Sequence, residues 1–372
     1  MTRPLRVVVD ATQIDNQNLG SGQYRYTADL LSGLAAEPDV RLTVLTSRRE
    51  RPERFPSGPE YVCFTPLGGR GYYYRDLARL SWWLGTHGAD VFHELHTNVP
   101  PWTFCPVVAT VYHYFEDTQL FSTRPYRYYQ WALRHRVDTI ITISNATRDA
   151  FHAHLGVPLD RMRTIYLGLS HSLQPGAAPP GRRYILSPYN LSLSKNLRAL
   201  VLAWPTIAAA ASELELWLYG RPQVTPESEA AFDALVRELP HGDRIRRVGP
   251  IDDATLSSLF AGCALFVFPT TVEGFGYPLL EAMAHGACCV TRNASAMKEV
   301  GADAVTLVET RSPVEIAAAV TTLLADPDER RRLGARARAR AELFTVERMI
   351  RDTLTTYAAV AAGQHPSGPA VL

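Results

Sequence analysis

One stretch of the chain, residues 266–281, constrains the fold more than any other. It begins with the apolar, aromatic and β-branched residues that are typical of a buried strand in a parallel sheet. A turn with two glycines, Gly274 and Gly276, follows and allows a ligand to approach the backbone closely. Pro278 suits the first position of a helix, so residues 279–285 are predicted to be helical. The amides at such a helix start bind anions, phosphate above all, and the stretch therefore predicts a phosphate site.

Two carboxylates, Glu273 and Glu281, frame this predicted anion site. Because carboxylates repel phosphate, we expect both to accept hydrogen bonds from hydroxyl groups of the ligand. A ligand with phosphates in its middle and hydroxyl-bearing rings on both sides fits this pattern, as a nucleotide-sugar does. The alternative is a glycine-rich turn between a strand and a helix of another α/β protein, with two solvated glutamates.

The spacing of Glu273 and Glu281 resembles the E-x7-E signature of the retaining, GT-B-fold glycosyltransferases of family 4. The similarity continues through residues 282–286 and 298–301 and extends over about residues 5–345. The resemblance implies an α/β fold with two doubly wound, Rossmann-like domains that face each other across a cleft. It also implies transfer of a mannose- or glucose-type hexose, for example from GDP-mannose, to a glycan or lipid-linked hydroxyl during synthesis of cell-surface polysaccharide or glycolipid.

Composition fits two soluble domains. The chain has 372 residues, which is comfortable for two cores of ordinary size, and 46% of them are hydrophobic. A net charge of +1 provides no overall field for nucleic acid. Five scattered cysteines read as reduced, mostly buried thiols, and the amino terminus shows no signal peptide, so we expect a cytoplasmic protein.

Alternating predicted strands and helices divide the chain into two doubly wound halves. A Pro-, Gly- and Ala-rich stretch between them reads as an interdomain linker. The resemblance implies that the last helix crosses back to the amino-terminal domain. The expected parts are an acceptor-binding domain at 1–169, the linker at 170–181, a nucleotide-sugar-binding domain at 182–345, the returning helix at 346–362 and a loose tail at 363–372.

Lysine is scarce in this chain, because only Lys195 and Lys298 are lysines among 38 basic residues. The family usually has a glycine and an arginine ahead of a Lys-Asn pair, and this chain keeps Lys195 and Asn196 but lacks the other two. The resemblance implies that Lys195 neutralises the donor diphosphate, a task that suits a point charge. An exposed lysine without a role is the alternative.

Two positions in the amino-terminal half also correspond to family site positions. Gly22 lies in a glycine loop after the first predicted strand, and Gln23 stands where the family commonly has arginine. His113 follows the predicted strand 107–111, although the aspartate that often accompanies this histidine is missing. A simple tight turn and a structural histidine remain the alternatives.

The resemblance assigns roles to the remaining residues. Glu281 would hold the ribose, and Glu273 with nearby backbone amides would hold the transferred sugar. The sequence has no Asp-x-Asp metal clamp, so we expect neither an obligatory metal nor a cofactor. The predicted catalytic residues are Glu273, Lys195 and His113, and the predicted donor-binding residues are Gly22, Asn190, Lys195, Glu273, Gly274, Phe275, Gly276, Tyr277 and Glu281.

Residues 70–84 and 121–137 combine tyrosines and tryptophans with arginines, and the second segment has no acidic residue. Such surfaces suit an anionic membrane or a lipid-diphosphate acceptor, which predicts peripheral contact with the cytoplasmic face of a membrane. The alternative is a pair of helices that pack their aromatic side chains inward.

Other functions remain open at this stage. A non-catalytic nucleotide-sugar sensor or scaffold would explain the replaced glycine, arginine and aspartate. A nucleotide-sugar epimerase or a phosphorylase would use a similar anion site, although a phosphorylase needs a lysine for pyridoxal phosphate and the chain has two lysines in all.

Overall fold

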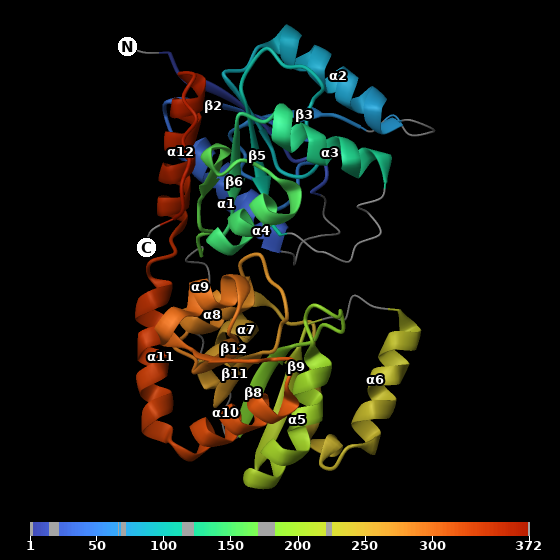
Figure 1. The fold of residues 1–372 in the computed structure, drawn as a ribbon, viewed down its shortest axis with the longest axis vertical. Coiled ribbons are helices and arrows are strands. Elements are labelled where there is room, and N and C mark those ends of the chain that lie inside the picture. The colour runs from blue at the N-terminus through green and yellow to red at the C-terminus, as the bar shows by residue number, and fades with distance from the viewer. Residues whose placement is uncertain are drawn as a thin grey trace. The chain divides into compact units, whose positions relative to one another are not determined.

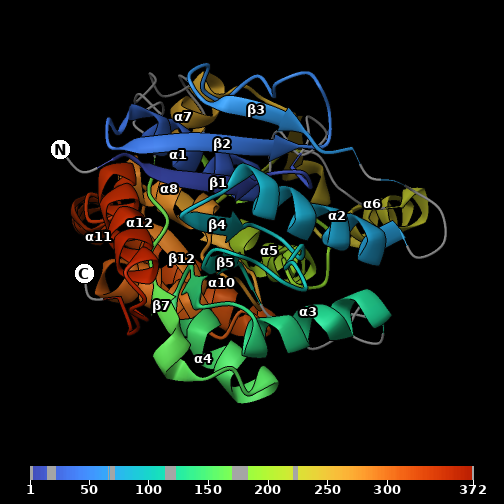
Figure 2. The same cartoon turned by 90° about the horizontal axis from the view of Figure 1, so that it is seen from above.

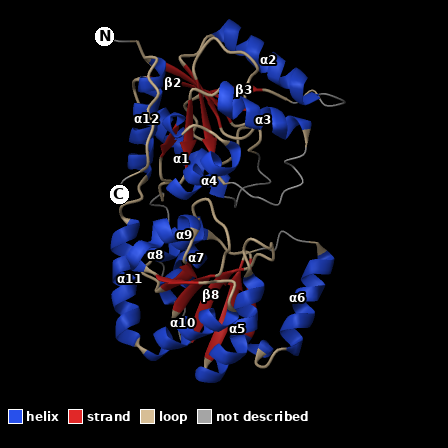
Figure 3. Cartoon of the chain, viewed as in Figure 1, coloured by secondary structure: helices blue, strands red, loops and turns tan. Residues whose placement is uncertain are grey.

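The structure is a computed structural model that describes residues 3–14, 22–65, 67, 72–113, 123–169, 183–220 and 225–370. The chain forms two compact units, of which the first contains Met1–Gly168 and Phe344–Leu372 and the second contains Leu169–Leu343. Both units are α/β, with strands enclosed by helices (Figures 1 and 3). The predicted linker at 170–181 lies outside the described residues. Within the described ranges, no helix is both long and apolar enough to cross a membrane.

The first unit contains a seven-stranded sheet in which all neighbouring strands are parallel. Its order is β3(Glu60–Cys63), β2(Val40–Thr46), β1(Leu5–Asp10), β4(Val91–Glu94), β5(Val107–Val111), β6(Thr139–Thr142) and β7(Met162–Thr164). Figure 2 shows β3, β2, β1 and β4 side by side. The inner strands β4, β5 and β6 are short and buried along their whole length, as expected where both faces of a sheet are covered.

Helices cover both faces of this sheet. Apolar residues of α2(Tyr72–His87), α3(Arg124–His135) and α4(Asn145–Leu155) share one core cluster with Phe92, Ala109 and Ile140 of the strands. The other face carries α1(Gly22–Ala36) and α12(Val346–Ala361), which pack on each other and on the sheet. The two helices approach closely, because a Cβ atom added at Gly33 would lie 2.3 Å from Cγ1 of Ile350.

A buried hydrogen-bond network joins α12 to the first sheet. Nδ1 of His93 lies 2.6 Å from the Tyr357 hydroxyl, and Nε2 lies 2.8 Å from Oγ1 of Thr110. The hydroxyl of Tyr26 in α1 lies 3.1 Å from Oγ1 of Thr110. Burial lowers the pKa of His93 to about 3, so the imidazole is neutral at pH 7. The last helix of the chain therefore belongs to the first unit through buried polar contacts as well as apolar ones.

The second unit contains a six-stranded parallel sheet. Its order is β10(Ile245–Gly249), β9(Leu214–Tyr219), β8(Arg183–Pro188), β11(Leu265–Phe268), β12(Cys289–Arg292) and β13(Thr306–Val308). Trp204 is fully buried in a core cluster of this unit. The helices are α5(Leu197–Ala210), α6(Pro226–Glu238), α7(Asp253–Gly262), α8(Tyr277–Ala284), α9(Ser295–Gly301), α10(Pro313–Ala325) and α11(Pro327–Ala341).

Two expectations from the sequence were wrong. The tail after residue 363 was expected to be loose, but Gly368 accepts from the amide of Thr164 at 3.0 Å and donates to the carbonyl of Met162 at 2.9 Å. Gly368 thereby pairs with backbone groups on the open edge of β7. Asn145 also holds Ala370 by two hydrogen bonds. Only two of the five free cysteines are buried, rather than most of them, and Cys63 is exposed because it lies on the edge strand β3.

Candidate functional site

The strand order of the second sheet marks the carboxyl ends of β8 and β11 as a candidate ligand site. The chain runs from β8 outward through β9 to β10, and β11 then starts on the other side of β8 and continues to β12 and β13. Open α/β sheets bind ligands at the carboxyl ends of the two strands where the order reverses in this way. Lys195 lies in the loop after β8, and Glu273 lies in the loop after β11. The fold therefore brings two residues predicted from the sequence to the place where a ligand is expected.

Lys195 and Glu273 form an ion pair at this position, with Nζ of the lysine on Oε1 of the carboxylate. Oγ1 of Thr270 lies 3.2 Å from the same oxygen. The two charged side chains are only 30% and 13% exposed, and the ammonium also lies 5.7 Å from the centre of the Phe268 ring. A charge in such a sheltered place acts on a ligand with less screening than one in bulk water.

Hydrogen bonds fix the loop that carries Lys195 to the end of β11. The carbonyl of Ser194 accepts from the amide of Thr271 at 2.7 Å and from the hydroxyl of Thr270 at 2.8 Å. Asn196 has a left-handed backbone, with φ of 52°, which asparagine tolerates better than most residues. Its side-chain amide donates to the carbonyls of Pro269 and Thr310 at 3.0 and 2.7 Å. The lysine is thus held by a loop with little freedom to move.

The glycine turn leads directly into α8, as the sequence predicted. Gly276 has φ of 92°, and a Cβ atom added there would lie 2.1 Å from Cε of Met297. Both observations require glycine at this position. Pro278 lies in the first turn of the helix, and Glu281 is 3% exposed one turn later. The positive end of the helix dipole therefore follows the Glu273 turn directly in the chain.

The other predicted site residues are distributed over both units. Asn190 uses its side-chain oxygen to accept from the amide of Ser192 at 2.9 Å and so shapes the Lys195 loop. Phe275 and Tyr277 meet edge to face, with ring centres 5.7 Å apart. Gly22 is the first residue of α1 in the first unit, and His113 is exposed after β5 in the same unit. The neighbouring Gly20 and Ser21 lie outside the described residues.

Sequence reasoning missed several residues that build the site. Thr270 lies beside the Glu273 carboxylate, and Thr310 joins the loop of Asn196 to that of Thr270. The available signal for Thr270 was the pair of threonines that follows Pro269 at the end of β11. In the first unit, Asp10 and Glu94 were also missed, although each is an acidic residue that ends an apolar strand.

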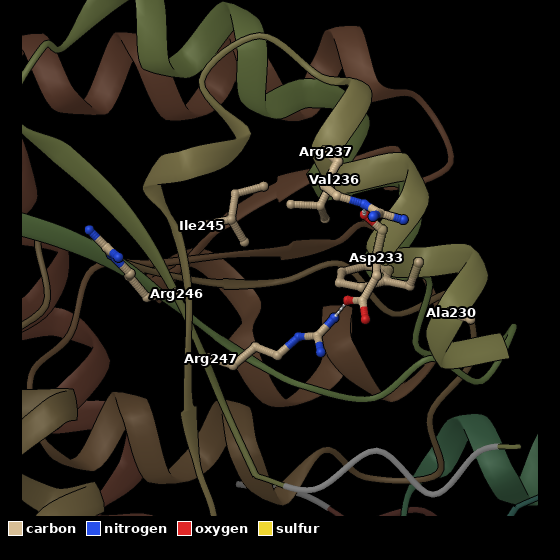
Figure 4. Close-up of a pocket in the computed structure, with 8 residues that line it drawn as sticks. Ala230, Asp233, Val236, Arg237, Ile245, Arg246 and Arg247 are labelled. Atoms are coloured by element: carbon tan, nitrogen blue, oxygen red, sulfur yellow. Dashed lines mark hydrogen bonds and ion pairs between the residues drawn. The ribbon is translucent and has the colours of Figure 1, made fainter. Parts of the chain in front are cut away.

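A hollow of about 660 Å³ lies elsewhere in the second unit, between α6 and β10 (Figure 4). Arg247 faces it and pairs with Asp233, and it also lies 3.4 Å from a carboxylate oxygen of Glu229. Its guanidinium lies 4.8 Å from the centre of the Tyr189 ring. The charge of Arg247 is already neutralised by these carboxylates, and β10 is an edge strand. We therefore assign Arg247 and the side chains around the hollow a structural role, which is to hold α6 to the sheet.

The aromatic and basic helices of the first unit bury some of their aromatic side chains and expose others. Tyr129 is buried, whereas Trp82 and Trp131 are 66% and 45% exposed. Tyr73, Tyr74 and Tyr128 meet edge to face and join α2 to α3. The inward-packing alternative therefore describes only part of this surface.

Comparison with known proteins shows the family of the chain. The family model described as "Glycosyltransferase Family 4" matches residues 20–173, and the model described as "Glycosyl transferases group 1" matches residues 172–340. The two matches follow one another along almost the whole chain. The chain belongs to the family 4 glycosyltransferases. This glycosyltransferase is 28% identical over 264 residues to O-antigen chain mannosyltransferase B of Escherichia coli, covering 65% of this chain and 68% of the relative.

Solved structures show that the glycosyltransferase has the GT-B fold. It superposes on sucrose-phosphate synthase from Thermosynechococcus elongatus with a TM-score of 0.79 at 19% identity, over 97% of this chain and 100% of the other. It superposes on Anabaena HepE in complex with UDP with a TM-score of 0.77 at 17% identity, over 95% and 99% of the two chains. The fold class predicted from the sequence is therefore confirmed.

Proposed function

We propose that this glycosyltransferase moves a hexose from a nucleoside-diphosphate sugar to a hydroxyl group of a glycan or lipid-linked acceptor, with retention of configuration, during synthesis of a cell-surface glycan. The observation that carries the proposal is the Lys195–Glu273 pair at the switch point of the second sheet, next to the start of α8. The similarity to an O-antigen chain mannosyltransferase supports mannose as the sugar and GDP-mannose as the first donor to test.

In this proposal the cationic side chain binds the diphosphate, and the two carboxylates bind hydroxyl groups. Lys195 attracts the donor diphosphate and stabilises the negative charge that grows on it as the sugar leaves. Glu273 accepts hydrogen bonds from hydroxyls of the transferred sugar, and Glu281 does the same for the ribose. Because the donor brings its own negative charge to Lys195, the contact between the lysine and Glu273 weakens when the donor binds. This frees the carboxylate for the sugar.

The reaction needs no group beyond the two substrates. The bond from the anomeric carbon to the phosphate oxygen breaks, and a bond to the acceptor oxygen forms on the same face of the sugar. The acceptor proton moves to the departing phosphate, which leaves as a nucleoside diphosphate. His113 and Gly22 belong to the unit assigned to the acceptor, and we propose that they contact the substrates in this complex.

A thermal-shift screen with GDP, UDP, ADP and their common sugars tests the proposal. A ligand that binds only the folded protein raises its stability, so one nucleotide series is expected to raise the melting temperature more than the other two. GDP-mannose is expected to give the largest shift and then to release GDP when an acceptor extract is added. Donor binding without transfer to any acceptor would indicate a sensor, and the absence of any shift would contradict the proposal.

We also propose that the surface of α2 and α3 contacts an anionic membrane. Changing Arg124, Arg127, Arg134 and Arg136 to glutamine is expected to lower binding to phosphatidylglycerol vesicles at least tenfold, since each basic residue near such a surface contributes about 1 kcal/mol. Sedimentation with vesicles measures the effect. The matched control changes four exposed arginines of α11, namely Arg331, Arg332, Arg336 and Arg338. Equal binding of both variants and the unchanged protein would contradict a membrane contact here.

A further inference from the structure

Arg292, the last residue of β12, is a buried cation to which the proposed reaction assigns no role. The residue is 8% exposed and lies on the strand next to β11. Its Nη1 donates to Oε1 of Glu309, which directly follows β13, at 2.8 Å. The amide of Arg311 donates to the same carboxylate oxygen at 2.9 Å. Because a buried charge is costly unless it is paired, this carboxylate makes the burial of the guanidinium possible.

The guanidinium also fixes the direction of a buried hydroxyl group. Nη1 of Arg292 lies 3.5 Å from Oγ1 of Thr310. Since a guanidinium only donates, the threonine oxygen accepts on this side, and its single proton is left for another acceptor. That acceptor is the carbonyl of Thr270, at 2.8 Å. Thr310 is 1% exposed, so water has little access to this hydrogen bond.

Thr310 connects the two loops that carry the charged pair of the donor site. Its hydroxyl holds Thr270, whose Oγ1 lies 3.2 Å from the Glu273 carboxylate. Its carbonyl accepts from the side-chain amide of Asn196 at 2.7 Å, and Asn196 directly follows Lys195. One residue after β13 thus holds the loop after β11 and the loop after β8.

The placement of these two loops matters for the rate. Lys195 and Glu273 lie in different loops, so the position of one charge relative to the other depends on how the loops are held together. Charges that stabilise a transition state act best when they are in place before the reaction. A misplacement of about 1 Å can lower a rate about 10²-fold. A hydrogen bond that fixes both loops therefore affects the rate more than its own strength suggests.

We propose that Thr310, with its hydroxyl oriented by Arg292, is a positioning residue for the glycosyl transfer and sets the relative placement of Lys195 and Glu273. The proposal rests on the proposed function, because that function supplies the reaction. Thr310 acts through Thr270 and Asn196 rather than on the substrates. Loss of its hydroxyl is expected to let the two loops shift while the sheet stays folded.

NMR of lysine labelled with ¹³C at Cε tests this positioning without requiring turnover. The chain has two lysines, Lys195 and Lys298, so the labelled protein gives two signals, and Lys298→Arg assigns them. Thr310→Val keeps the shape of the side chain and removes the hydroxyl. It is expected to move the Lys195 signal, because the surroundings of the ammonium change, and to leave the Lys298 signal in place. Thr310→Ser restores the hydroxyl and should return the Lys195 signal to its original position.

Steady-state kinetics with GDP-mannose as the donor measure the consequence. Thr310→Val is expected to lower kcat by about 10–10²-fold, the effect of a small misplacement. KM for the donor should rise less than about threefold, because Lys195 is still present and its charge acts over a distance. Thr310→Ser should recover most of the lost kcat.

Arg292→Gln tests the outer part of the arrangement. Without the guanidinium the Thr310 hydroxyl is less well oriented, so kcat is expected to fall, but by less than in Thr310→Val. Adding Arg292→Gln to Thr310→Val should lower kcat no further, because residues that act through one hydrogen bond are not additive. Arg292→Gln carries the same test if Thr310→Val does not fold.

Thr356→Val is the matched control for loss of a buried hydroxyl. Thr356 lies in α12 of the first unit, is fully buried and donates to the carbonyl of Asp352 at 2.8 Å. Its replacement should lower the melting temperature about as much as Thr310→Val does. The Lys195 signal and kcat should stay unchanged in this control.

The outcomes separate this inference from the proposed function. An unmoved Lys195 signal and an unchanged kcat in Thr310→Val would overturn the positioning role and leave Thr310 as a contribution to stability alone. Equal changes in Thr356→Val would overturn it too, because they would show a general loosening. If the Lys195 signal responds to Thr310→Val but no nucleotide-sugar is bound or transferred, the positioning of Lys195 stands and the proposed function fails. If transfer occurs and the signal does not respond, the reverse holds.

Discussion

Replacing Lys195 by alanine is expected to lower kcat/KM for the nucleotide-sugar by about 10²–10³-fold, the effect of removing one preorganised group that stabilises developing charge. The variant loses the only cation that the described residues place against Glu273. The carboxylate then stands alone where the diphosphate is expected, so donor binding weakens as well. Steady-state kinetics with GDP-mannose should show a lower kcat together with a higher KM.

A matched control and a double variant sharpen this prediction. Lys298 is the other lysine of the chain and is exposed on α9, so Lys298→Ala should leave kcat/KM unchanged. Adding Glu273→Gln to Lys195→Ala removes the uncompensated negative charge and should restore part of the donor affinity but none of the kcat. If Lys195→Ala and Lys298→Ala behave alike, the assignment of Lys195 is wrong.

Replacing Gly276 by alanine should destabilise the second unit and abolish donor binding. A left-handed backbone costs a residue with a Cβ atom about 1–2 kcal/mol. The collision with Met297 adds about 1–3 kcal/mol, which is typical of overpacking. Urea unfolding measures the loss of stability, and calorimetry with the nucleotide found in the screen measures binding. Both should change, because Gly276 lies between the Glu273 loop and α8.

Gly220 provides the control for backbone strain alone. It has φ of 99°, and a Cβ atom added there would meet nothing within 4 Å, so Gly220→Ala should show only the smaller loss. Met297→Ala combined with Gly276→Ala should be less destabilised than the sum of the two single changes, because the methionine terminus no longer collides. Equal losses for the two glycine variants would contradict the role of Met297.

The sequence predicted most of the fold because strong local patterns repeat along the chain. Apolar runs such as residues 265–268 and 107–111 lie in buried strands, and these appear where they were expected. The short strands β7 and β13 were missed, since three residues carry too little pattern to be recognised. The tail was mistaken for a loose end because its contact with β7 uses backbone groups of Gly368, which leave no trace in side-chain patterns.

The site was predictable only in part for a similar reason. Lys195 was recognised by the scarcity of lysine and by the family resemblance, and Glu273 by its turn after a strand and its spacing to Glu281. Their ion pair depends on β8 and β11 being neighbours, which requires the strand order. Glu94 was overlooked because a glutamate at the end of a strand usually faces water. The structure shows that this one is fully buried, close enough to Tyr73 of α2 and Tyr129 of α3 to act on them electrostatically.

The place of α12 has a consequence for synthesis of the protein on the ribosome. The first unit is made from the beginning of the chain but takes its last helix, with Tyr357 against His93, from the end. Residues 169–343 can fold as soon as they emerge, whereas the unit that starts first must wait for the final residues. Nascent chains that stall before α12 would therefore leave the apolar face of α1 uncovered and exposed to chaperones, even though the second unit is already complete.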